Sequence, residues 1–288
     1  MRFELRWIEP VMPVPYIPTL GPVHPDDPHL GLLEAVVANA VTGRSLPYDK
    51  DRRWSEAKTE RVVDGIEHDR HRTLVPTVLG RGSGMAKVHV YGNGPDCLSA
   101  GADLARKVAA AHGAARARVV WFLGPGQPEE RVRGGVRVRL RDFADGPGQA
   151  PDRQVRAYER LDHPERFATF AERMAADGFG FLHERMRAGT AAPVLTVLDA
   201  DSVVGAIGPM ETMSDAVGRA RLLPQYFGVL PEYRGRGYGR ALWRAAMCWG
   251  HRHGAAYQLL QTEVGGASDR LCAAEGLTSL GFVMHRTV

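Results

Sequence analysis

The stretch YRGRGYG, residues Tyr233 to Gly239, combines three glycines with two arginines. It follows the strand-like run YFGVLPE and precedes the helix-like run RALWRAAMCWGHRHG. Glycines let a backbone approach a ligand closely, and a helix N-terminus presents unpaired amide donors with partial positive charge. These features together predict a phosphate-binding loop between a strand and a helix.

Two common phosphate-binding fingerprints do not fit this stretch. The dinucleotide pattern G-x-G-x-x-G fails because its third glycine would fall at Arg240, and the lysine of a nucleotide P-loop is absent. An arginine–glycine RNA-binding tail fits poorly as well, because the motif occurs once and lies between a strand and a helix. We therefore expect no nucleic-acid partner.

The spacing that fits is R-x-x-G-x-G, at Arg234, Gly237 and Gly239, after V-x-P at Val229–Pro231. With these residues the sequence resembles the GNAT N-acetyltransferase superfamily. The resemblance runs from the strand-like stretch GVRVRLRDF to the C-terminus, where Gly281–Phe282 match the family's terminal G-F. It implies an α/β fold with a mixed, mostly antiparallel central sheet flanked by helices. It also implies an acyltransferase that uses acetyl-CoA or another acyl-CoA.

The resemblance places the acyl donor on this stretch. Amides from about Gly235 to Arg240 would hold the pyrophosphate, with the helix dipole behind them. The preceding strand would splay from the next one and bind the pantetheine arm as an added strand would, with the Val229 amide aimed at the thioester oxygen. No metal is expected. The expected cofactor-binding residues are Phe227, Gly228, Val229, Arg234, Gly235, Arg236, Gly237, Tyr238, Gly239 and Arg240.

Acetyl transfer to an amine needs an uncharged nucleophile, a polarised thioester and a proton for the leaving thiolate. Glu263, at the end of QLLQTEV, is the candidate general base, and a surface carboxylate at a strand end is the alternative. Tyr226 is the candidate for lining the acceptor pocket, or else a core aromatic residue. Glu211 and Asp215 would attract a cationic acceptor or be solvated loop acids.

The proton donor departs from the family pattern. Many GNAT members carry a tyrosine four residues before the terminal glycine, and this sequence has Leu277 there. An apolar side chain cannot protonate coenzyme A. Water, Ser268 or Cys272 would substitute, or the thiolate would leave without assistance.

A tetrapeptide, HGAA, occurs at residues 112–115 and again at residues 253–256. Each copy follows a strand-like run, a glycine-bearing loop and a helix-like run, and precedes a second strand-like run. Shared order and spacing favour duplication over chance. We therefore predict two GNAT-like domains, 1–130 and 134–288, of which the second is catalytic.

The first copy is predicted to be degenerate. Where the second has YRGRGYGR, it has GNGPDCLSAG, so the arginines are gone. Pro95 removes an amide donor and Asp96 would place an anion against a pyrophosphate. This copy should complete the core or wall the acceptor pocket rather than bind acyl-CoA.

Hydrophobic spacing and turn residues predict the remaining elements. We expect a hairpin around Asp199–Asp201. The expected strands include residues 3–9 and 220–230, and the expected helices include 29–41, 55–69, 164–178 and 181–189.

The chain has 288 residues, 44% of them apolar and 24% charged, and a net charge of +4. No apolar run approaches the ~20 residues of a membrane helix. We expect a cytoplasmic monomer or homodimer that acetylates a small-molecule amine. Two alternatives stay open: transfer of a longer acyl or an aminoacyl group, and a non-catalytic acyl-CoA-binding regulatory module.

Overall fold

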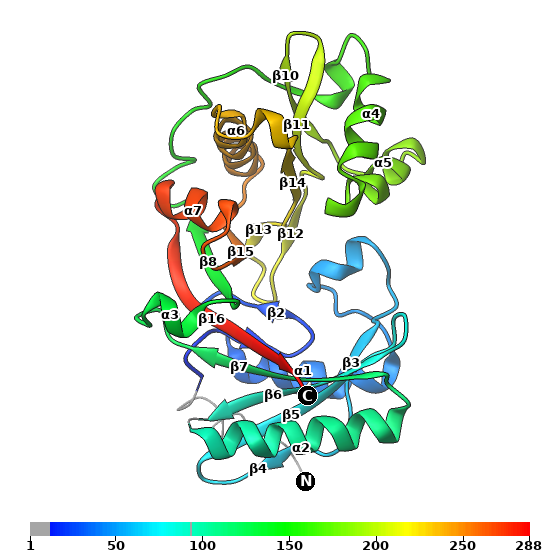
Figure 1. Cartoon of the computed structure of the whole chain (residues 1–288), viewed down its shortest axis with the longest axis vertical. Helices are drawn as coiled ribbons and strands as arrows, with labels where there is room; N and C mark the ends of the chain where they lie inside the picture. The colour runs from blue at the N-terminus through cyan, green and yellow to red at the C-terminus, as the bar shows by residue number, and fades with distance from the viewer. Residues whose placement is uncertain (1–11, 93) are drawn as a thin grey trace. The chain divides into compact units, whose positions relative to one another are not determined.

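The structure, a computed structural model, describes residues 12–92 and 94–288 (Figure 1). The strand predicted for residues 3–9 lies outside the described residues. The chain divides into two compact units. One comprises residues up to 140 together with 259–288, and the other comprises residues 141–258.

The first unit contains a mixed sheet with the strand order β8-β16-β7-β6-β5-β3. Strands β6 and β7 are parallel, and the other neighbours in this series are antiparallel. The strands are β3 (Glu60–Val62), β5 (Arg72–Leu79), β6 (Met85–Gly92), β7 (Arg116–Leu123), β8 (Val136–Asp142) and β16 (Thr278–Thr287); β4 (Glu67–His68) also pairs with β5. The smaller elements are β1 (Tyr16–Ile17), β2 (Gly21–Pro22), α1 (His29–Asn39), α3 (Glu129–Val132) and α7 (Ala267–Ala274).

Helix α2 (Pro95–His112) connects the parallel pair β6 and β7 and packs on one face of their sheet (Figure 1). Its buried Leu104 and Val108 lie in one core cluster with Val90 of β6. A Cβ added at Gly101 would lie 2.6 Å from a methyl group of Val90, so only glycine allows this close approach.

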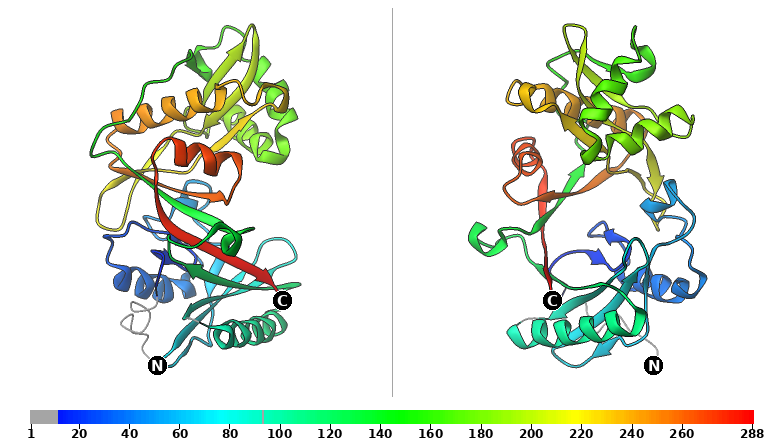
Figure 2. Two further views of the ribbon diagram at one scale, coloured as in Figure 1. Left: turned by 60° about the vertical axis from the view of Figure 1, so that its left-hand side comes forward. Right: turned by 45° about the vertical axis from the view of Figure 1, so that its right-hand side comes forward.

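The second unit contains a four-stranded antiparallel sheet with the order β14-β11-β10-β9. Helix α6 lies on one face, and α4 and α5 lie on the opposite face (Figures 1 and 2). A short hairpin, β12 and β13, pairs in parallel with the start of β15. The elements are β9 (Val155–Ala157), α4 (Arg166–Arg173), α5 (Phe179–Arg187), β10 (Leu195–Asp199), β11 (Ser202–Gly208), β12 (Thr212–Ser214), β13 (Ala220–Leu222), β14 (Tyr226–Val229) and α6 (Tyr238–Arg252). Strand β15 (Tyr257–Glu263) begins in this unit and continues into the first from Leu259.

Most predicted elements are confirmed. The hairpin turns at Ala200, which has a left-handed backbone with φ of 49°. Helices α1 and α4 lie within their predicted segments, and α5 overlaps the segment predicted at 181–189 but begins earlier, at Phe179. The α/β class and the mixed, mostly antiparallel sheets flanked by helices follow the predicted fold.

Two predicted elements are wrong. Residues 55–69 form no long helix but contain β3 and β4, because β5 provides a pairing edge and Gly65, at φ of 101°, breaks the run between them. Residues 220–230 form no long strand either. Pro224, which has no N–H to pair, separates β13 from β14, and these strands lie in different sheets.

The two HGAA copies end their helices in the same way. Gly113 after α2 and Gly254 after α6 have φ of 63° and 75°. The next alanine donates to the carbonyl five residues earlier in both copies, Ala114 to Ala109 at 2.9 Å and Ala255 to Gly250 at 3.0 Å. This is the hydrogen bond of a Schellman motif. The repeat seen in the sequence is therefore a repeat of backbone geometry.

The copies differ at the loop that precedes the helix. Strand β6 ends at Gly92 and α2 begins at Pro95, and β6 pairs with β7 along Met85–Val90. Strand β14 leads to α6 through residues 230–237 and lies in a different sheet from β15. Only the second copy therefore combines a long loop with strands that separate.

The division into domains 1–130 and 134–288 stays a prediction about sequence relationship. The compact units have different boundaries from these predicted domains. Strand β16, at the C-terminal end of the chain, belongs to the first unit and pairs there with β7 as well as β8. Gly281 sits at the irregularity of this strand with φ of 123°, and a Cβ there would lie 2.6 Å from the Leu123 carbonyl oxygen. The glycine of the terminal G-F pair is thus required by strand packing.

We predict that a fragment of residues 134–288 does not fold on its own. It lacks β7, so the segment Phe282–Thr287 loses the ladder that it forms with Arg118–Leu123. An exposed, unpaired strand edge promotes aggregation. Size-exclusion chromatography and thermal melting should show aggregates without a cooperative transition, while a chain shortened only to residues 12–288 melts cooperatively. A soluble, cooperatively melting 134–288 fragment would contradict this prediction.

Candidate functional site

The stretch 233–239 forms a loop that ends in the first turn of α6. Gly235 and Gly237 both have left-handed backbones, with φ of 77° and 88°, and Gly237 is the N-cap of the helix. The amide of Ala241 donates to the Gly237 carbonyl, so the amides of residues 238–240 precede the first helical hydrogen bond. Residues 234–237 are exposed. The loop thus presents backbone donors at the positive end of a helix dipole.

The base of this loop is tied to the strand before it. Arg234 Nε donates to the Val229 carbonyl oxygen at 3.0 Å, and a single 3-10 turn at Pro231–Tyr233 lies between them. Glu232 forms an ion pair with Arg173 of α4, with Arg173 Nη1 and Glu232 Oε1 2.7 Å apart. The first arginine of the motif therefore ties the loop to β14 through its Nε, and its predicted role in cofactor binding stays a prediction.

Strand β14 has two different faces and one edge without a strand partner. Phe227 and Val229 face α6, since a Cβ at Gly239 would lie 3.4 Å from the Phe227 ring and 3.7 Å from a Val229 methyl group. Gly228 faces the other way, where a Cβ would lie 3.0 Å from the Phe179 ring. Among the described strands, β14 is the edge of its sheet. A strand edge offers backbone groups to an extended ligand.

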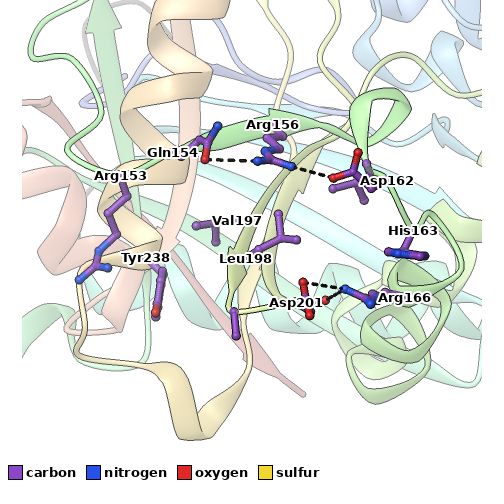
Figure 3. Close-up of a pocket in the computed structure, with 12 residues that line it drawn as sticks. Arg153, Gln154, Arg156, Asp162, His163, Arg166, Val197, Leu198, Asp201 and Tyr238 are labelled. Carbon is purple, nitrogen blue, oxygen red and sulfur yellow. Dashed lines mark hydrogen bonds and ion pairs between the residues drawn. The ribbon is translucent and has the colours of Figure 1, made fainter.

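A cavity of about 460 Å³ opens beside the start of α6 (Figure 3). Arg153 and Tyr238 lie at one end of the view, and two ion pairs lie at the other. The residues that line it are Arg153, Gln154, Arg156, Leu161, Asp162, His163, Arg166, Val197, Leu198, Ala200, Asp201 and Tyr238; the pairs are Arg156 with Asp162 and Arg166 with Asp201, both at 3.3 Å.

The two candidate catalytic residues lie in different compact units. Tyr226, in the same unit as the loop at residues 233–239, is half-buried and packs toward α5, where a Cβ at Gly178 would overlap its ring. Its ring centroid is 6.3 Å from that of Phe179. Glu263 ends β15 in the other unit and its side chain is exposed. Their catalytic roles therefore stay predictions.

A buried ionic network holds the turn that follows Glu263, and the sequence analysis missed it. Asp269, in the first turn of α7, accepts hydrogen bonds from Thr262 Oγ1 and the Gly265 amide, each at 3.1 Å. It also pairs with Arg139 at 2.8 Å and Arg137 at 3.0 Å. The local signal was an acidic residue just after GGAS, a common helix start. The arginines could not be assigned, because they come from a strand far away in the sequence.

Burial opposes the charge of Asp269, but its partners outweigh burial. The Gly265 amide and the guanidinium groups of Arg139 and Arg137 hold the pKa of this carboxyl below its usual value. The network therefore stabilises the turn that carries Glu263 while the carboxyl is ionised.

Leu277 and the candidate proton donors Cys272 and Ser268 differ in how exposed their side chains are. Leu277 is buried, and its carbonyl accepts from Arg139 at 3.1 Å. Burial raises the pKa of the Cys272 thiol to about 11, which does not favour an acylated cysteine. Ser268 is exposed.

The expectation that Asp215 is a solvated loop acid is wrong. Its side chain is buried and accepts hydrogen bonds from the Tyr257 hydroxyl at 3.0 Å and Arg219 Nε at 2.9 Å. It closes the β12–β13 hairpin, a structural task that long-range packing creates. Glu211 precedes β12 and is partly exposed.

Within residues 12–92 and 94–288, no three His, Cys, Asp or Glu side chains gather to hold a metal ion. Over the same described ranges, no helix is long and apolar enough to span a membrane.

Residues 155–273 match the sequence profile of the acetyltransferase (GNAT) family. This segment contains the glycine-containing loop at residues 233–239, α6 and β15. It is a GNAT acetyltransferase domain. GNAT proteins are acyltransferases, and the chain is therefore assigned to that enzyme class.

Several solved structures similar to the chain are described as GNAT proteins, and no curated protein sequence matches it significantly. A GCN5-related N-acetyltransferase from Sphaerobacter thermophilus is 18% identical, with 78% of this chain and 82% of that chain covered and a TM-score of 0.47. A tandem GNAT protein from the clavulanic acid biosynthesis pathway is 15% identical, with 89% and 93% covered and a TM-score of 0.45. A GNAT-family acetyltransferase from Colwellia psychrerythraea is 12% identical, with 85% and 91% covered and a TM-score of 0.47.

We predict that Asp269→Asn lowers the unfolding free energy by about 3 kcal/mol at pH 7, because it leaves buried arginine charge without its counterion. The folded pKa of Asp269 lies below the unfolded value, so its stabilisation is complete above about pH 4 and is lost as the pH falls through the folded pKa. Urea titrations from pH 7 to pH 3 should show the difference shrink with acid.

The control is Asp103→Asn, which removes a carboxylate from an exposed pair with Arg106. It should change the unfolding free energy by less than about 0.5 kcal/mol. A loss at Asp269→Asn that stays constant down to pH 3 would contradict the ionic account.

Proposed function

We propose that the chain is an acetyl-CoA-dependent N-acetyltransferase that transfers acetyl directly to a small-molecule amine. The observation that carries the proposal is the loop with left-handed Gly235 and Gly237 at the N-terminus of α6, inside the segment that matches the GNAT profile. Its backbone donors suit a pyrophosphate, and the adjoining edge of β14 suits a pantetheine arm.

In this proposal the amides of residues 235–240 bind the pyrophosphate, and the dipole of α6 supports the charge. The arm of the donor runs along β14, where Phe227, Gly228 and Val229 supply backbone groups. The Val229 amide would then donate to the thioester oxygen and stabilise the oxyanion of the tetrahedral intermediate. Arg234 shapes the loop through the Val229 carbonyl.

The chemical step forms the C–N bond and breaks the C–S bond at the acetyl carbonyl carbon. Glu263 is proposed as the base that takes the proton of the attacking amine, directly or through water. Tyr226 is proposed to line the acceptor pocket. Leu277 offers no proton, so the thiolate would be protonated by water.

The proposed enzyme works in the cytoplasm as a monomer or homodimer. Its first copy would not bind a second donor. Helix α2 begins after Gly94 with Pro95, which has no amide donor, and Asp96 in its first turn would repel a pyrophosphate. Transfer of a longer acyl or an aminoacyl group, and acyl-CoA binding without catalysis, are the alternatives that thiol-release assays with several donors would separate.

The donor site is tested by paired substitutions at Gly237. Asp and Asn have similar sizes and both tolerate a left-handed backbone, but only Asp adds a negative charge. Calorimetry should show that Gly237→Asp weakens CoA binding by roughly 100-fold and Gly237→Asn by much less, because the anion repels the pyrophosphate.

The control for this experiment is Gly254→Asp, at a left-handed position with open space around it at the other end of α6. It should leave the affinity for CoA within about threefold of the wild type. Equal losses for Gly237→Asp and Gly237→Asn would show that charge at this position is irrelevant and would refute the phosphate site.

The proposed base is tested by Glu263→Gln, which keeps the size of the side chain and removes its basicity. Turnover, followed as thiol release with a panel of small amines, should fall by roughly 10²–10⁴-fold. The loss should shrink at high pH, where the amine loses its proton without help, and CoA affinity should be unchanged. Glu130→Gln, at an exposed residue of α3, is the matched control. Near-normal turnover of Glu263→Gln at every pH would exclude this base.

A further inference from the structure

An arginine outside the R-x-x-G-x-G motif reaches the phosphate loop. Arg153 precedes β9, and its Nη2 donates a hydrogen bond to the Arg236 carbonyl oxygen at 2.8 Å. Its Cζ lies 4.6 Å from the centroid of the Tyr238 ring, a cation–π contact. Figure 3 shows Arg153 beside Tyr238 at the edge of the cavity. Arg153 thus contacts both residues that flank Gly237.

The hydrogen bond sets the orientation of one peptide group. The Arg236–Gly237 peptide is trans, so its C=O and N–H point in opposite directions. A carbonyl held by Arg153 therefore directs the Gly237 N–H away from Arg153. Glycine would otherwise let this peptide rotate, because it has few conformational restrictions.

The contact with Tyr238 fixes the guanidinium itself. Tyr238 is the first residue of α6, is 6% exposed and packs edge-on against Tyr233. A planar guanidinium that stacks on a buried ring loses less freedom on hydrogen bonding than a mobile ammonium does. Arg153 is therefore anchored on the helix whose N-terminal amides it borders.

The other arginines of the cavity are engaged differently. Arg156 and Arg166 form ion pairs with Asp162 and Asp201, and Figure 3 shows these pairs away from Tyr238. Arg153 instead contacts the Arg236 carbonyl oxygen and the Tyr238 ring. Its Nε would also lie 3.4 Å from a Cβ added at Gly237, so it occupies the space beside the glycine.

We propose that Arg153 is a positioning residue for the acyl donor: it holds the Arg236–Gly237 peptide so that the Gly237 amide faces the pyrophosphate. The inference rests on the proposed donor site in the phosphate loop. Arg153 acts through the Arg236 carbonyl, and its charge need not touch the phosphate.

The test measures CoA binding to Arg153→Ala, Arg153→Lys and the wild type. Loss of a hydrogen bond from a charged donor should weaken CoA binding about tenfold in Arg153→Ala. Arg153→Lys should recover only part of this loss, because an ammonium keeps the charge without the planar fork. The KM for acetyl-pantetheine, which lacks the pyrophosphate, should not change in any variant.

A second readout follows the free protein by hydrogen exchange. Arg153→Ala should speed exchange of the amides at 235–238 and leave the middle of α6 and the melting temperature unchanged. Arg160→Gln removes the same charge from an exposed residue in the same segment and should change neither exchange nor CoA affinity.

The outcomes separate this inference from the donor site itself. Normal CoA affinity in Arg153→Ala, with binding still lost in Gly237→Asp, would overturn the inference and leave the site intact. Full rescue by Arg153→Lys with unchanged exchange in Arg153→Ala would show a direct charge effect and also overturn it. Absence of CoA binding by the wild type would refute both.

Discussion

The turn from β14 into α6 is the constraint on which the account depends. The chain must leave a strand, reverse and start a helix whose first amides precede the first helical hydrogen bond. Two residues with left-handed backbones, Gly235 and Gly237, make this possible. Residues that carry a Cβ rarely adopt this conformation. The same geometry that satisfies the turn leaves the amides of residues 238–240 outside the helical hydrogen bonds, next to the exposed residues 234–237. A structural requirement and the proposed phosphate site therefore coincide in seven residues.

The two copies show how the same helix ending can serve different loops. Both α2 and α6 end in HGAA with a left-handed glycine and the same hydrogen bond. Upstream, the first copy has a short connection and a continuous parallel ladder between β6 and β7, which leaves no separated strands. The second copy has a long loop, and Pro224 helps to place β13 and β14 in different sheets. The two copies therefore differ most in the segment where the second copy is proposed to bind the acyl donor. This difference agrees with the prediction that the first copy completes the core and does not bind acyl-CoA.

Local signals in the sequence predicted the features that depend on local backbone geometry. The glycines of the loop, the helix ends at HGAA and the hairpin at Ala200 each require a turn or a left-handed residue within a few positions. Long-range packing determined what the sequence could not reveal. Residues 55–69 became strands because β5 offered an edge, and Asp215 was buried by Tyr257 and Arg219. The contact from Arg153 to Arg236 likewise joins segments with no shared sequence signal.

The number of CoA molecules bound per chain tests the central claim most directly. Native mass spectrometry of the full-length protein with excess CoA measures it without knowledge of the acceptor. The account predicts that each chain saturates at one CoA, because, among the described residues, only the second copy combines a long loop before its helix with a strand edge that pairs with no other strand. Two CoA molecules per chain, or none at saturating concentration, would contradict it.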